Sequence, residues 1–120
     1  MATLTATLTL GSSNTISNES LALTISKDHT VEKPLVNSGS VLATAAGAVA
    51  VFAATAGVRY VYAKNTDNSN SADLQRTAGP SVVSLGPGEF CFLPWVSSTG
   101  LSAQGIGGDV TVEYAFFTKS

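Results

Sequence analysis

The fold is decided by the stretch Val58-Arg59-Tyr60-Val61-Tyr62-Ala63-Lys64-Asn65-Thr66-Asp67, a polar loop, Pro80-Ser81-Val82-Val83-Ser84-Leu85, Gly86-Pro87-Gly88 and Glu89-Phe90-Cys91-Phe92-Leu93-Pro94-Trp95. Its three apolar runs are rich in β-branched and aromatic residues, and turn residues separate them, which is typical of successive antiparallel strands. Between the second and third runs, Pro87 presets φ at one central turn position and Gly88 supplies the positive φ that a type II turn needs next. The stretch therefore predicts a β-meander on which the rest of the chain packs.

The N-terminal segment 2–10 alternates more strictly than any other part of the chain, with Ala or Leu at even positions and Thr at odd positions. This pattern predicts a half-buried strand. A charged bend is expected at 27–30. Between these two segments the alternation returns over 20–26, and the side chains expected to face inward there are Leu21, Leu23 and Ile25.

Residues 41–58 carry no charge and consist mostly of Ala, Thr, Gly and Val. The length alone would suit a transmembrane helix, but Ala, Thr and Gly insert into a bilayer less favourably than Leu, Ile or Phe. An Ala-rich buried helix is a second interpretation. We favour a strand over about 48–54 with turns at Gly47 and Gly57. Because such a strand is apolar on both faces, it must lie between two layers or against a partner.

The C-terminal part alternates between turn-rich and apolar segments. Residues 74–77 read as a short strand, and 97–108, with four glycines, read as a long pliant loop. Residues 109–119 predict the last strand. Eight or so short strands with turn signals between them favour an all-β fold, a single antiparallel β-sandwich or jelly-roll-like domain over residues 1–120.

The composition limits the classes of function. The chain has 120 residues, enough for one core, and 12% of them are charged, against about 25% in ordinary soluble domains. Ser and Thr supply the missing polar surface, which suits a protein packed within an assembly, where low charge costs less solubility. A net charge of −2 without a basic stripe argues against nucleic acid as a partner.

Few residues have the chemistry of a catalytic or metal site. Cys91 is the single cysteine, so an intramolecular disulfide and a thiolate cluster are excluded, and its two Phe neighbours favour a small apolar packing role. His29, in the charged bend, is interpreted as solvated. Residues 67–73 place oxygen ligands at alternate positions, as calcium loops do, but they lack the expected Gly and Glu, and a hairpin tip explains the same residues. We expect no enzyme, no cofactor and no metal.

Three segments together resemble a known group of proteins. They are Arg59–Asp67, Leu85–Trp95 and the closing Val112-Glu113-Tyr114-Ala115-Phe116-Phe117. Their order, with Lys-Asn-Thr-Asp after a strand and Pro-Gly-Glu before an aromatic strand, resembles small β-rich virion structural proteins of tailed bacteriophages, especially cyanophages. The resemblance covers the C-terminal half of the chain. It implies a non-enzymatic virion part and brings no catalytic residues.

The resemblance implies a virion part but does not choose between head and tail. The small size, the lack of repeats or a fibrous segment and the few exposed-aromatic candidates favour the head. We therefore expect a capsid decoration (cement) protein on the capsid surface of the virion, with the major capsid protein as its partner. A homo-oligomer, trimer or dimer, is expected, without nucleic acid or membrane. The first strand and the Gly-rich segment 97–108 are candidate adhesive elements. The candidate interface residues are Leu4, Leu8, Trp95, Leu101 and Ile106.

The alternative is a tail or fibre module that binds a host cell-surface glycan through Trp95, the 65–73 loop and nearby tyrosines. Trp95 itself has three interpretations: an interface anchor, a sugar platform, or a residue that closes one end of the sandwich. A periplasmic-type binding module is disfavoured, because the first residues show no basic region or cleavage pattern of a secretory signal.

Overall fold

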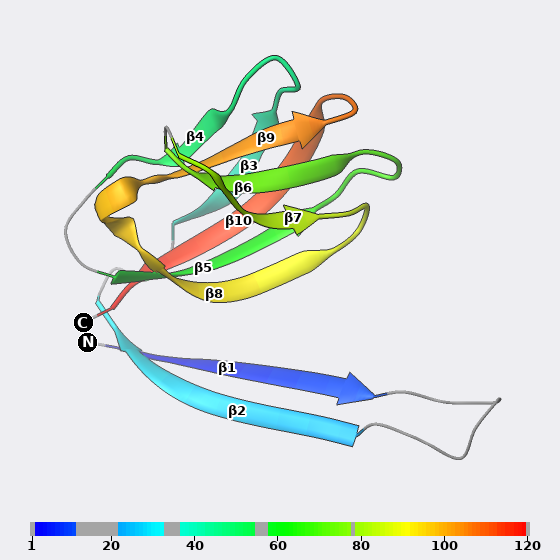
Figure 1. Cartoon of the computed structure of the whole chain (residues 1–120). Coiled ribbons are helices and arrows are strands. Elements are labelled where there is room, and N and C mark those ends of the chain that lie inside the picture. The colour runs from blue at the N-terminus through cyan, green and yellow to red at the C-terminus, as the bar shows by residue number, and fades with distance from the viewer. Residues whose placement is uncertain (1, 12–21, 33–36, 55–57, 78, 120) are drawn as a thin grey trace, which may run out of the picture.

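The computed structural model describes residues 2–11, 22–32, 37–54, 58–77 and 79–119, and over these ranges the chain is all-β (Figure 1). No helix in the described part of the chain has the length and apolar character needed to cross a membrane. The elements are β1 (Ala2–Gly11), β2 (Ala22–Val31), β3 (Asn37–Ala43), β4 (Val49–Phe52), β5 (Val58–Asn65), β6 (Ser71–Arg76), β7 (Ser81–Leu85), β8 (Phe90–Val96), a 3₁₀ turn (Ser97–Thr99), β9 (Leu101–Ile106) and β10 (Val110–Thr118).

Eight of the strands form a sandwich of two antiparallel sheets. One sheet has the order β3-β10-β5-β8 and is called the β5 sheet; the other has the order β4-β9-β6-β7 and is called the β6 sheet. Four of the pairings are nested: β6 with β7, β5 with β8, β4 with β9, and β3 with β10. The eight strands are thus one long antiparallel ribbon rolled up, with successive pairs falling in opposite sheets. This is the jelly-roll arrangement, and it confirms the predicted fold class.

The core lies between the two sheets, where inward side chains alternate with outward ones along each strand. Small residues allow the sheets to approach, and Leu, Val and aromatic side chains fill the space between them. The buried apolar cluster is Ala43, Phe52, Val61, Ala63, Ala72, Leu74, Leu85, Trp95, Leu101, Ala103, Val110, Val112 and Phe116.

The described part of the uncharged segment 41–58 contributes to this core. Residues 49–52 form β4, as the preferred prediction had it, and the two helical interpretations are wrong for the described residues of the segment. Phe52 belongs to the core and Val51 packs against it. Facing the core accounts for the apolar character of these positions only, since Leu42 and Ala50 are uncharged and exposed.

The Gly-rich segment 97–108 corrects a prediction. It is not one long loop: a 3₁₀ turn leads into β9, which pairs with both β4 and β6. Gly105 explains part of the error, because a Cβ built there would collide with the carbonyl oxygen of Gly108 and lie 2.7 Å from that of Ala43. Glycine is used here for close backbone approach rather than for flexibility.

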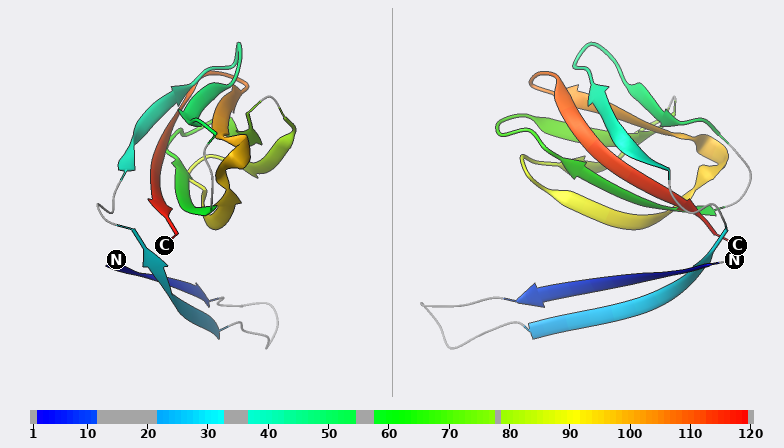
Figure 2. Two further views of the ribbon diagram at one scale, coloured as in Figure 1. Left: turned by 90° about the vertical axis from the view of Figure 1, so that its left-hand side faces the viewer. Right: turned by 180° about the vertical axis from the view of Figure 1, so that it is seen from behind.

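The remaining two strands, β1 and β2, form a two-stranded sheet of their own outside the sandwich, here called the arm (Figure 1; Figure 2). The predicted charged bend at 27–30 is wrong, because those residues continue β2 in register with β1. The arm joins the sandwich at one end. Val31 is fully buried and bridges to Lys119, and the Glu32 N–H donates to the Thr118 carbonyl at 2.9 Å.

Candidate functional site

The two faces of the arm differ sharply in chemistry. The register places Leu8 opposite Ile25 and Leu10 opposite Leu23, so the apolar positions of both strands share one face. The other face carries hydroxyls and one carboxylate. The paired hydroxyls hold the strands together: Thr5 Oγ1 donates to Asp28 Oδ1 at 2.7 Å, and the Thr7 and Ser26 hydroxyl oxygens lie 3.1 Å apart. The alternation predicted over 2–10 is thus realised as a two-faced hairpin.

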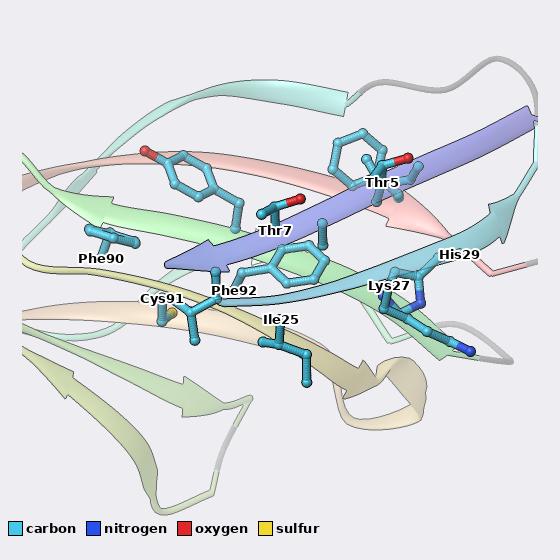
Figure 3. A pocket seen from close by; sticks show the side chains of 13 residues that line it. Thr5, Thr7, Ile25, Lys27, His29, Phe90, Cys91 and Phe92 are labelled. Carbon is cyan, nitrogen blue, oxygen red and sulfur yellow. The ribbon is translucent and has the colours of Figure 1, made fainter. Parts of the chain in front are cut away.

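The apolar face of the arm looks onto the outer face of the β5 sheet, and a cleft of about 690 Å³ separates the two (Figure 3). The arm supplies one side of this cleft and strands β5, β8 and β10 supply the other. Its lining is mostly apolar, and Lys27 is the one lysine, arginine, aspartate or glutamate in it. The lining residues are Leu4, Thr5, Ala6, Thr7, Leu8, Ile25, Lys27, His29, Tyr62, Phe90, Cys91, Phe92 and Phe117.

The end of the cleft nearest the arm's attachment is closed by aromatic contacts. The His29 ring lies 4.3 Å from the Tyr60 ring, and Phe92 lies 6.2 Å from each of them, measured between ring centroids. Tyr60 is only 7% exposed as a result. His29, interpreted from the sequence as solvated, is half-buried against these rings and fixes the base of the arm.

The other end of the cleft is open. Ile25 is 60% exposed and Phe90 is 63% exposed, and the remaining apolar side chains near the arm's tip are also more than two-fifths exposed. An isolated two-stranded hairpin is marginally stable in water, and a contiguous exposed apolar surface indicates an interaction site. The residues of this open surface are Leu8, Leu10, Leu23, Ile25 and Phe90, and the partly exposed Phe92 borders it on the side of the closed end.

The structure places the five candidate interface residues in three settings. Leu4 and Leu8 line the cleft, on the arm. Ile106 is exposed at the end of β9, in the other sheet. Trp95 and Leu101 are 5% and 1% exposed and belong to the core, so neither is part of the exposed apolar surface. The Trp95 indole N–H donates to the Gly100 carbonyl at 3.0 Å, which matches the interpretation that Trp95 closes the sandwich.

The sequence did not identify the residues that form the apolar cleft together with Leu4 and Leu8. Leu23 and Ile25 were expected to face inward, yet both are exposed, because β2 lies outside the sandwich. Leu21, the third residue of that prediction, lies outside the described residues. Phe90 and Phe92 alternate with Cys91 and so share one face of β8, but nothing in the sequence shows that this face is the outer one. The available signal was the matched apolar alternation of 2–10 and 20–26, which suggests two strands of one hairpin.

The motifs that carry the phage resemblance meet at one end of the sandwich, around Asn65. This side chain is fully buried, and its Nδ2 donates to the carbonyls of Asn70, Leu85 and Gly86 at 2.9, 3.0 and 3.1 Å. The Gly88 N–H donates to the Asn65 carbonyl, and Gly88 has φ +76°, as the predicted type II turn requires. The motifs therefore have a structural role in this chain: they lock two loops together.

The 67–73 loop is held by its own aspartate. The Asp67 carboxylate accepts the N–H groups of Asn70 and Ser69 at 2.6 and 3.0 Å, and these bonds lower the pKa of Asp67 below its ordinary value. This is the local hydrogen bonding by which Asp favours turns. Among the residues with described positions, no three His, Cys, Asp or Glu side chains are grouped as metal ligands would be.

Cys91 is half-buried and packs against the core. Burial raises the pKa of its thiol, although a backbone hydrogen bond from Ala63 opposes the shift. Because the thiolate is the reactive form, alkylation by iodoacetamide at pH 7.5 should be about tenfold slower or more in the folded chain than in urea. The folded-state rate should rise with pH beyond the ordinary thiol pKa. Equal rates in buffer and in urea would contradict the burial of this thiol.

Comparisons of the chain with protein-family models, with curated proteins and with solved structures found no match. The functional inference therefore depends on the arm, the cleft and the sequence resemblance.

Proposed function

We propose that this protein is a non-enzymatic structural component of a phage virion, a capsid decoration (cement) protein that binds the outer capsid surface and stabilises the head. The observation that carries the proposal is the arm. Its apolar face is only partly covered by its own sandwich, and Ile25 near its tip is 60% exposed. A chain that leaves such a surface open is suited to burying it in an assembly.

Surface chemistry supports the same function. The arm's second face is lined with hydroxyls, and charged residues make up 12% of the chain. Each contact through an apolar or hydroxyl-rich surface contributes little binding free energy. Several such contacts made at once on a capsid add up to stable binding through multivalency. Jelly rolls also occur as viral capsid domains, an analogy at the level of the fold.

The glycan-binding alternative has one supporting feature. A shallow depression of about 470 Å³ is lined by Tyr62, Tyr114, Glu113, Ala115 and residues 38–40. Aromatic rings beside a carboxylate and serine hydroxyls suit a sugar. However, Trp95, the main aromatic candidate for this function, is buried. We therefore favour the head over a tail or fibre module.

The first test is the copy number of this chain in purified virions, measured by quantitative mass spectrometry against the major capsid protein. The expected result is about one copy per capsid subunit, because decoration relies on many weak contacts. A few dozen copies per particle would overturn the head assignment and favour the tail module. Absence from the particles would overturn the virion function as a whole.

A further inference from the structure

We infer that the open end of the cleft is the self-association surface of this protein and that its occupant is a second copy of the same chain, related by a two-fold axis. The inference rests on the proposed function, because it identifies the surface through which a decoration oligomer would form. In this arrangement the apolar tip of each arm packs over the aromatic edge of the other copy's β5 sheet.

The size of the open surface fits this occupant. Leu8, Leu10, Leu23, Ile25, Phe90 and Phe92 are between 39% and 63% exposed. At side-chain areas of about 150–200 Å², these six present roughly 500 Å² of surface per chain. Two copies would bury roughly 1,000 Å², the area at which specific interfaces begin. The open surface of a second copy is therefore large enough to cover the open surface of the first.

The chemistry of the surface also favours a copy of itself. A two-fold interface brings the same patch together from both partners, so the patch must be self-complementary. An apolar patch meets this condition, and a patch of one charge would not. Lys27 and His29 lie toward the attached end of the arm, two and four residues from Ile25 along β2. The exposed tip positions of the arm are aliphatic. The charge-depleted centre and aromatic content match those of protein interfaces.

The docking is through side chains rather than by addition of a strand. β8 is an edge strand of the β5 sheet and borders the cleft. Pro94 lies in β8 and has no backbone N–H, which interrupts the row of donors that an added strand would use. The aromatic side chains Phe90 and Phe92 are left as the contacts that β8 offers.

The test measures the mass of the full chain in solution by sedimentation velocity over a range of protein concentrations. The unchanged protein should form a dimer. Leu8→Thr combined with Ile25→Thr removes apolar surface from the arm while keeping residues that favour strands, and Phe90→Thr does so on the sandwich. Each should raise the dimer dissociation constant at least about tenfold. Val82→Thr, equally apolar and 47% exposed on β7, is the matched control and should leave it unchanged.

Circular dichroism of each variant shows whether the fold is kept, and Phe90→Thr tests the surface without altering the arm. A monomer at all concentrations, a trimer, or a dimer that tolerates both sets of variants would overturn the inference. If the unchanged protein is a monomer and the variants no longer bind capsids, the inference is overturned and the cleft is a capsid-binding surface instead. Because self-association is measured without capsids, its failure leaves the copy-number test of the proposed function intact.

Discussion

Asn65→Ala is expected to lower the free energy of unfolding by about 3–5 kcal/mol, because each buried polar group left without a partner costs about 1–3 kcal/mol. The two N–H groups of the Asn65 amide are shared among three carbonyl oxygens, those of Asn70, Leu85 and Gly86. Its Oδ1 also accepts the Asp67 N–H at 2.9 Å. Truncation therefore releases both the 66–70 loop and the turn before β8.

Urea unfolding followed by circular dichroism measures this loss. Asn68→Ala, an exposed asparagine in the same loop, is the matched control and should change stability by less than about 0.5 kcal/mol. Asn65→Asp keeps an acceptor for the Asp67 N–H but turns carboxylate oxygens toward three carbonyls, so it should cost at least as much as alanine at pH 7. A loss below about 1 kcal/mol for Asn65→Ala would show that water or a shift of the loops replaces the amide.

Gly105→Ala is expected to destabilise the protein by about 3 kcal/mol or more, at or above the upper end of the usual cost of overpacking. The new methyl group would meet backbone on two sides, the carbonyls of Gly108 and Ala43, and backbone cannot move aside as a flexible side chain can. The Gly105 N–H also donates to the Thr44 carbonyl at 3.1 Å. The substitution thus strains the point where β9 passes the end of β3.

Gly47→Ala is the matched control, because a Cβ there would have no atom within 4 Å. Its effect should lie within about 0.5 kcal/mol of zero. Thermal unfolding of both variants separates the two cases. Similar stability of the two variants would mean that the approach of β9 to its neighbours is looser than the structure shows.

The strands that were predicted well are those whose signal is local. Alternation over 2–10, the apolar run 48–54 and the Gly86-Pro87-Gly88 turn each follow from the properties of adjacent residues, and the structure has β1, β4 and a glycine with positive φ in those places. Gly105 was wrongly predicted to lie in a loop, because the sequence does not distinguish a glycine required for close packing from a glycine in a loop. The difference lies in the carbonyls of Gly108 and Ala43, which only the fold brings there.

The candidate site was predicted in part for a similar reason. Alternation identified Leu4 and Leu8 as one face of a strand, but it does not say what lies opposite that face. Trp95 and Leu101 have the residue types of interface anchors, and their burial depends on the packing of the two sheets. Asn65 gave no sequence signal of burial, because asparagine is usually exposed. Its role appears only when two loops converge on it.

The nested pairing of the sandwich strands has a consequence for how the chain folds. The separation in sequence between partners is smallest for β6 and β7 and grows outward to β3 and β10. Each outer pair closes a longer loop and so loses more chain entropy unless the pair inside it has formed. Folding is therefore expected to nucleate at the β6–β7 hairpin and to proceed outward, at the slow rates of folds dominated by non-local contacts. The arm attaches beyond the outermost pair, so its apolar face can contact the β5 sheet only after that pair has formed.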